Sequence, residues 1–159
     1  MSTINPALTI LLADDDEEDR TMTIEALRER RVANDIRCVA DGQELVDYLF
    51  RRGAYADGAD APMPGLILLD LNMPRKDGRE ALAEMKTDPA LRSIPVVVLT
   101  TSRAEEDIVR TYDLGVNSFI SKPVTFNGLV QAMDVFSRYW LEIVELPLAS
   151  ETVEGDRAR

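Results

Sequence analysis

Asp70 stands at the end of the apolar run 66–69, where its carboxylate is placed to do chemistry. The run, Leu-Ile-Leu-Leu after Gly65, is typical of a strand buried on both faces, as in a parallel sheet. A carboxylate at the C-terminal end of such a strand lies where open α/β sheets bind their ligands. A simpler alternative is that Asp70 only caps the next turn, which would suffice if no other strand brought matching residues to the same edge.

Three other apolar runs also end in polar residues. They are 8–13 followed by Asp14-Asp15-Asp16, 95–99 followed by Thr100-Thr101-Ser102, and 118–121 followed by Lys122-Pro123. The C-terminal ends of parallel strands open on one edge of a sheet. We therefore expect the acidic pair, Asp70, Thr100 and Lys122 to converge there.

The residue types at this predicted edge form a complete set for phosphoryl transfer. Close carboxylates repel one another, and a divalent cation relieves that repulsion. One carboxylate can then act as a nucleophile toward phosphorus, while an ammonium and a hydroxyl interact with the oxygens of the transferring group. Taken singly, Asp16 could be a helix cap, Lys122 a solvated side chain and Thr100 a strand-end polar group. Their joint occurrence on four strand ends argues against coincidence.

Strands and helices alternate along the chain. The strands are expected over 8–13, 36–39, 66–70, 95–100 and 118–121, and the helices over 17–30, 42–51, 79–87, 104–114 and 126–143. This alternation predicts an α/β fold, a doubly wound parallel sheet of five strands with right-handed crossovers. The segment 51–64 is rich in glycine and proline and is expected to be a long surface loop without regular structure.

Composition excludes several classes of function. The 159 residues suit one domain, and the net charge of −11 argues against a nucleic-acid ligand, which requires a basic face. No apolar segment is long enough to cross a bilayer, and residues 1–6 do not form a signal peptide, so no membrane partner is expected. The single cysteine, Cys38, is expected to be a packed residue and fits a cytoplasmic location.

The chain contains no histidine. This excludes histidine-based zinc sites, Ser-His-Asp and Cys-His catalysis, and an imidazole general base. Any metal must be held by oxygen ligands, which points to Mg²⁺ or Mn²⁺. The protein also cannot itself carry a phosphohistidine.

The last expected helix, 126–143, has an unusually long apolar stripe. Its members are Leu129, Met133, Phe136, Trp140 and Ile143, spaced close to a coiled-coil seam. Trp140 is expected to lie beyond the edge of the sheet, where a monomer would have difficulty burying it. The stripe therefore predicts a homodimer interface containing Phe136, Trp140 and Leu146, with ordinary core packing as the competing account.

Over residues 8–140 the chain resembles the receiver domain of bacterial two-component response regulators. The resemblance is carried by Asp14-Asp15, by Thr100-Thr101, by Lys122-Pro123, and by the highly specific string Asp70-Leu71-Asn72-Met73-Pro74-Arg75-Lys76-Asp77-Gly78. It implies a flavodoxin-like receiver domain over 1–145, followed by an extended C-terminal tail over 146–159.

The resemblance also implies a role for each matching residue. Asp70 would be the phosphoacceptor, and the metal ligands would be Asp15 directly, Asp14 through water, Asp70, and Asn72 through its backbone carbonyl. Thr100 would be the switch hydroxyl, Lys122 would pair with the phosphoryl group, and Phe119 would be the switch aromatic, acting by packing alone. The Lys122–Pro123 bond is expected to be cis, as is usual in this family.

A narrower resemblance is to the single-domain regulators paired with bacterial phytochromes, carried by the long loop before 66–70 and by residues 138–142 with their tail. It implies phosphorylation by a separate sensor histidine kinase, a phytochrome, and a response expressed as a population shift on the face formed by 104–114, 118–121 and 126–143. That face and the tail would build the homodimer.

Two other functions remain open. A magnesium-dependent phosphatase could use the same aspartyl-phosphate chemistry, although many such enzymes place an acid where this chain has Asn72. A receiver-like binding module that is never phosphorylated is the other alternative, against which the complete acceptor set argues. The sequence favours a phosphorylatable switch that is not an enzyme.

Overall fold

The computed structural model describes residues 8–30, 32, 34–58, 61–100, 113–123 and 125–143. Its strands are β1 (Thr9–Ala13), β2 (Asp35–Val39), β3 (Leu66–Leu69), β4 (Val96–Thr100) and β5 (Ser118–Ser121). They form one parallel sheet in the order β2-β1-β3-β4-β5, with Leu12 opposite Leu68 and Cys38, and Leu68 opposite Val97. The prediction of a five-stranded, doubly wound parallel sheet is therefore confirmed.

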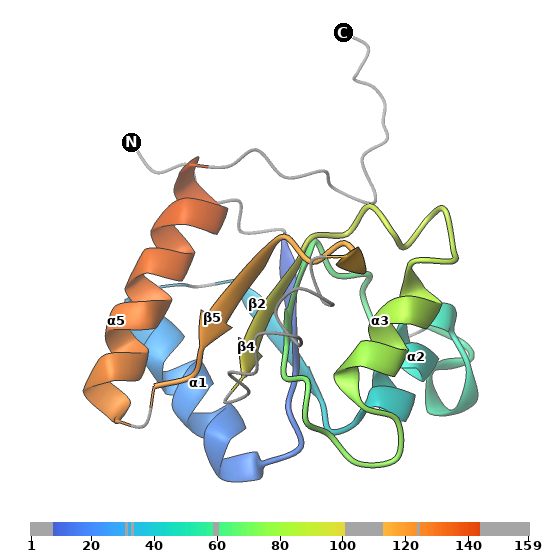
Figure 1. The fold of residues 1–159 in the computed structure, drawn as a ribbon, viewed down its shortest axis with the longest axis horizontal. Coiled ribbons are helices and arrows are strands. Elements are labelled where there is room, and N and C mark those ends of the chain that lie inside the picture. The colour runs from blue at the N-terminus through green and yellow to red at the C-terminus, as the bar shows by residue number, and fades with distance from the viewer. Residues whose placement is uncertain are drawn as a thin grey trace, which may run out of the picture.

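Helices cover both faces of this sheet. They are α1 (Glu17–Glu29), α2 (Gly42–Phe50), α3 (Gly78–Met85) and α5 (Phe126–Ser137). In Figure 1, α1 and α5 lie together on one face, and α2 and α3 lie on the other. Side chains of β1 and β3 alternate between the two layers. Ile10 and Leu68 pack under α1 and α5, while Leu11 and Leu69 pack with α2 and α3.

Each of the α-helices named above begins after a residue whose side chain caps it. Asp16, Asp41 and Thr125 accept backbone N–H groups from the first turns of α1, α2 and α5. Asp77 starts α3 with a complete capping box, in which Glu80 returns a bond to the Asp77 N–H. Because β1 and β2 end only a few residues before the caps Asp16 and Asp41, the chain turns sharply from strand to helix there, whereas the loop 70–77 connects β3 to α3.

The observed bounds agree with the sequence expectations within two residues for every expected element that is described, except that the expected helix over 126–143 is α-helical only to Ser137. The expected helix over 104–114 falls almost entirely on 101–112, outside the described residues, as does the tail over 146–159. The loop over 51–64 is less irregular than expected. It contains the 3₁₀ turn Gly53–Tyr55, and Tyr55 and Met63 pack against the α2–α3 layer.

The expectation that Trp140 would be hard to bury in a single chain is wrong. Trp140 is 7 % exposed and joins Leu129, Met133 and Phe136 in the core under α1 and α5. Beyond Ser137 the helix continues as a π-helical segment, Arg138–Ile143. Trp140 stands four positions after Phe136, and residues at that helical spacing lie on the same face, which here is the inner one.

The large apolar side chains that are exposed on α5 and on the π-helical segment are different ones. Val135 and Tyr139 are 66 % and 49 % exposed, and Phe126 at the start of the helix is 37 % exposed. No helix within the part of the chain that the structure describes is both long enough and apolar enough to span a membrane.

Candidate functional site

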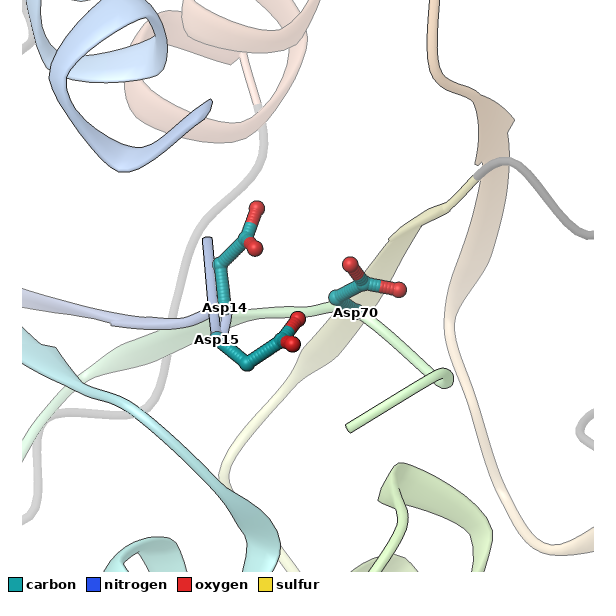
Figure 2. Close-up of side chains that lie close together, drawn as sticks. All are labelled: Asp14, Asp15 and Asp70. Carbon is teal, nitrogen blue, oxygen red and sulfur yellow. The ribbon is translucent and has the colours of Figure 1, made fainter. Parts of the chain in front are cut away.

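Three carboxylates meet at the C-terminal edge of the sheet. Asp14 and Asp15 follow β1, and Asp70 follows β3 (Figure 2). Each offers an oxygen within 4.8 Å of the others. Backbone bonds hold the strand ends together, because the Asp14 N–H donates to Val39 O at 3.1 Å and the Asp70 N–H donates to Ala13 O at 2.9 Å. The predicted convergence of the acidic pair and Asp70 is thus present in the structure.

Lys122, which follows β5, reaches this cluster. Its Nζ donates to Asp14 Oδ2 at 2.8 Å, to Asp19 Oδ2 at 3.1 Å and to Asp70 Oδ2 at 3.3 Å. Lys122, Asp14 and Asp70 are all buried. The single ammonium is therefore shared among several carboxylates, and the local charge remains negative without a metal ion.

Burial and charge act against each other on these groups. Burial alone would lower the pKa of Lys122, but hydrogen bonds to Asp14 and Asp19 and the Asp70 charge outweigh it and raise that pKa above its ordinary value. Burial raises the pKa of the Asp14 carboxyl, an effect that the hydrogen bond from Lys122 only partly offsets. Lys122 therefore stays charged at neutral pH, and the net negative charge of the cluster is the feature that a cation would relieve.

The loop after Asp70 fixes the orientation of that carboxylate. The Asn72 N–H donates to Asp70 Oδ1 at 3.0 Å. Gly78 closes the loop, because its N–H donates to Leu71 O at 2.9 Å, and a Cβ there would lie only 2.7 Å from Asp70 O. The glycine in the 70–78 string is thus required by the close approach of α3 to the strand end.

The same loop is held against the start of α2. The Arg75 guanidinium makes a paired bond to the Asp41 carboxylate, from Nε to Oδ2 at 2.9 Å and from Nη2 to Oδ1 at 3.0 Å. A Cβ on Gly42 would lie 1.8 Å from Lys76 O, so only glycine permits this contact. Two loops at the acidic edge are therefore locked together.

The donor set at the edge fits a hard divalent cation. All candidate side-chain ligands are carboxylate oxygens, two of them buried and that of Asp15 exposed to solvent. Mg²⁺ and Mn²⁺ prefer such oxygens, and Mg²⁺ keeps several waters, which the exposed side admits. The predicted metal ligands Asp14, Asp15 and Asp70 lie together, and Asn72 stands beside them in the adjoining loop.

The remaining predicted site residues lie on neighbouring strands. Thr100 ends β4, and its backbone pairs with Ser121 of β5. Phe119 on β5 is half-buried against the α2–α3 layer, in keeping with a packing role. The expectation of a cis Lys122–Pro123 bond is wrong, since every peptide bond in the described residues is trans. The trans preference before proline is only about 0.5–1 kcal/mol, so sequence alone does not determine the isomer.

Sequence reasoning missed two residues of the site, both on α1. Asp19 contacts Lys122, and Arg20 Nη1 donates to Asp14 O at 2.7 Å, which helps to hold the turn after β1. Both lie in the first turns of a helix. An acid there usually interacts favourably with the helix dipole, so the residue type of Asp19 did not indicate a role in the site. The indication that the sequence offered of their nearness to the site was their position, four and five residues after Asp15.

Comparisons with known proteins identify a family model, a relative and solved structures that are similar to this chain. Residues 10–134 match the family model described as response regulator receiver domain. The chain is 41% identical over 145 residues to Response regulator Rcp1 of Synechocystis sp., covering 91% of this chain and 97% of Rcp1. It resembles the solved structure of the phosphorylated cyanobacterial phytochrome response regulator RcpA with a TM-score of 0.82 and 44% identity, covering 89% of this chain and 99% of that one. For the Mn(2+)-bound form of Rcp1, the TM-score is 0.81 and the identity 40%, with coverage of 89% and 99%.

Proposed function

The chain belongs to the response regulator receiver domain family, and we propose that Asp70 is its phosphoacceptor. The protein acts in two-component signalling by phosphorylation on an aspartate. The observation that supports Asp70 is its position, buried among two other carboxylates and 3.3 Å from the Lys122 ammonium.

In the proposed reaction an Asp70 carboxylate oxygen attacks the phosphorus of a phosphohistidine on a sensor kinase. A P–O bond forms, the P–N bond breaks, and the imidazole leaves. The Asn72 N–H fixes the attacking carboxylate through Oδ1, while Lys122 Nζ faces Oδ2 and is placed to neutralise charge on the phosphoryl oxygens. Thr100, at the end of β4, is proposed to sense the phosphoryl group, and Phe119 to report it by repacking.

We propose Mg²⁺, with Mn²⁺ as a substitute, as the metal of this site. Asp15 and Asp70 would hold it directly, Asp14 through water, and Asn72 through its backbone carbonyl. When bound, the ion supplies positive charge beside the transferring group. The solvent-exposed Asp15 and the net negative charge of the cluster support this assignment.

The kinase partner is proposed to be a phytochrome in the cytoplasm. RcpA is described as a cyanobacterial phytochrome response regulator, and a further solved structure, AtBRR, is described as a bacteriophytochrome response regulator. AtBRR shares 40% identity with this chain, which covers 100% of it, at a TM-score of 0.69. Phosphotransfer from autophosphorylated phytochrome kinases, compared with kinases that carry other sensors, tests this pairing. Equal rates from both groups would contradict it.

A homodimer is proposed for the face that includes β5 and α5, but not through the residues first expected. Phe136 and Trp140 are buried within the chain, and Leu146 lies outside the described residues. Val135 on α5 and Tyr139 on the π-helical segment provide exposed apolar surface instead. Val135→Asp is therefore expected to shift the protein toward monomer with its fold intact, whereas Trp140→Ala destabilises the core by about 3–5 kcal/mol. Sedimentation equilibrium checks both, and a monomeric wild type would refute the dimer.

Phosphorylation by a small donor tests the proposed function without requiring the kinase. With Mg²⁺ and acetyl phosphate, the intact protein is expected to gain one phosphoryl group, and EDTA is expected to prevent the gain. A protein that stays unlabelled with Mg²⁺ present would favour the unphosphorylated binding module. Turnover of phosphomonoesters would instead favour the phosphatase.

A further inference from the structure

Lys122 has a third carboxylate partner that comes from a helix. Asp19 Oδ2, in the first turn of α1, lies 3.1 Å from Lys122 Nζ. An ammonium has three N–H donors, and the bonds to Asp14, Asp19 and Asp70 engage all of them. We propose that Asp19 is a positioning residue for phosphoryl transfer, which holds the Lys122 ammonium beside Asp70 while its other two partners change. The inference rests on the proposed role of Asp70.

The bond from Lys122 to Asp70 does not survive the reaction unchanged. At 3.3 Å it is the longest of the three. When Asp70 becomes an acyl phosphate, its carboxyl loses its charge, while the phosphoryl oxygens bring new negative charge. The ammonium is therefore drawn from Asp70 toward the phosphoryl group.

The bond from Lys122 to Asp14 is also altered by ligands. Asp14 belongs to the carboxylate cluster that fits a divalent cation, so its charge would be shared with the ion. A bound cation competes for Asp14 with the ammonium and weakens their attraction. Of the three partners of Lys122, two thus change their bonding as the site is loaded.

The bond between Asp19 and Lys122 is expected to stay the same while the other two partners of Lys122 change. It is not a member of the cluster formed by Asp14, Asp15 and Asp70. Its backbone N–H donates to the Asp16 cap at 3.1 Å, and α1 packs on α5, so the position of its main chain is fixed. Lysine has a flexible four-carbon stem, and a fixed third acceptor restricts where the ammonium can go. Because the Asp19 side chain is 39 % exposed, this ion pair adds little to stability, and its consequence is for position.

A competing role for Asp19 predicts the opposite effect of its removal on the rate of phosphorylation. The Asp19 carboxylate is negative and near a site that receives a negative phosphoryl group. If it mainly repelled that group, or drew Lys122 away from it, removing its charge would accelerate phosphorylation. If it positions Lys122, removing it slows the reaction.

The test compares full-length wild type, Asp19→Ala, Asp19→Asn and Glu18→Gln. Glu18 lies in the same first turn, is exposed, and carries the same charge. The Glu18 variant therefore matches the loss of net charge and of helix-dipole stabilisation. Three quantities are measured for each protein: the initial rate of phosphorylation by acetyl phosphate at saturating Mg²⁺, the Mg²⁺ dissociation constant by calorimetry, and the midpoint of thermal unfolding.

Asp19→Ala is expected to lower the rate by about tenfold, which corresponds to about 1.4 kcal/mol of transition-state stabilisation. Asp19→Asn, which keeps one acceptor oxygen, is expected to fall between Ala and wild type. In both Asp19 variants, the Mg²⁺ dissociation constant and the midpoint of thermal unfolding should change no more than in Glu18→Gln. The loss of rate would then be confined to the phosphoryl-transfer step. A rate equal to or above that of Glu18→Gln would overturn the inference while leaving Asp70 as the acceptor. An unlabelled wild type would overturn both.

Discussion

Two polar regions of this protein differ in how their hydrogen bonds and charges are balanced. We call Asp14, Asp15, Asp70 and Lys122 the acidic edge, and Glu44, Tyr48, Arg51 and Tyr55, with the loop they hold, the loop anchor. In the loop anchor, the side-chain donors of Tyr48, Arg51 and Tyr55 each have a hydrogen-bond acceptor. Tyr48 Oη donates to Pro62 O at 2.7 Å, Tyr55 Oη donates to Glu44 Oε2 at 2.6 Å, and Arg51 donates to Ala61 O. In the acidic edge, buried carboxylates share one ammonium.

The difference separates a region that stabilises the fold from one that is prepared to bind. Burial and the bond to Glu44 raise the pKa of Tyr55 above its ordinary value, so its hydroxyl keeps the proton that it donates. The loop anchor is thus complete without any ligand. The acidic edge retains like-charge repulsion that only a cation or a change of charge relieves. Substitutions should therefore affect the stability and the chemistry of the two regions differently.

The largest effect on stability is expected at Lys122. Lys122→Ala leaves the buried Asp14 and Asp70 carboxylates without their ammonium, and should lower the free energy of unfolding by about 3 kcal/mol. Urea unfolding in EDTA measures the loss. The matched control is Lys76→Ala, which removes a lysine from the more exposed ion pair with Glu84. A loss no greater than that of the control would show that the acidic edge does not depend on this ammonium.

The next effect concerns metal binding and separates Asp15 from Asp14. Asp15→Asn is expected to weaken Mg²⁺ binding by at least about tenfold, and Asp14→Asn by less, since Asp14 is proposed to act through water. Without metal, Asp15→Asn should stabilise the protein, because it removes repulsion from an exposed group. Asp14→Asn should not, because it also weakens the 2.8 Å bond from Lys122. Calorimetric titration and urea unfolding decide this, and equal or reversed losses of affinity would contradict the ligand roles.

The smallest effect is expected in the loop anchor. Tyr48→Phe removes one hydrogen bond to the loop and should lower the free energy of unfolding by about 1 kcal/mol. The rate of phosphorylation should not change. Tyr139→Phe, at an exposed position of the π-helical segment Arg138–Ile143, is the control and should alter neither quantity. A slower phosphorylation rate in Tyr48→Phe alone would show that the two regions are coupled.

The strands and the carboxylate cluster could be predicted from sequence because their signals are local. A run of aliphatic residues such as 66–69 predicts a buried strand, and its last residue predicts what reaches the edge. Parallel order then brings Asp14, Asp70 and Lys122 together without any knowledge of side-chain packing. The family assignment followed from the same residues and is confirmed.

What could not be predicted depends on contacts between distant segments. Trp140 was assigned to an interface because it was expected to lie beyond the edge of the sheet, whereas it is buried in the same core cluster as Met133 and Phe136. Asp19 looked like an ordinary first-turn acid, because its partner Lys122 is 103 residues away in sequence. The loop over 51–64 looked unstructured because its bonds come from the side chains of Tyr48 on α2 and of Arg51 at the start of the loop.

The location of the phosphoryl group tests the central claim most directly. The wild type and Asp70→Asn are treated with acetyl phosphate and Mg²⁺, the acyl phosphate is trapped by borohydride reduction, and the peptides are sequenced by mass spectrometry. We predict modification at Asp70 in the wild type and none in Asp70→Asn, a variant that keeps the shape of the side chain but lacks the nucleophile. Modification at Asp14 or Asp15 in the wild type, or undiminished labelling of Asp70→Asn, would contradict the assignment.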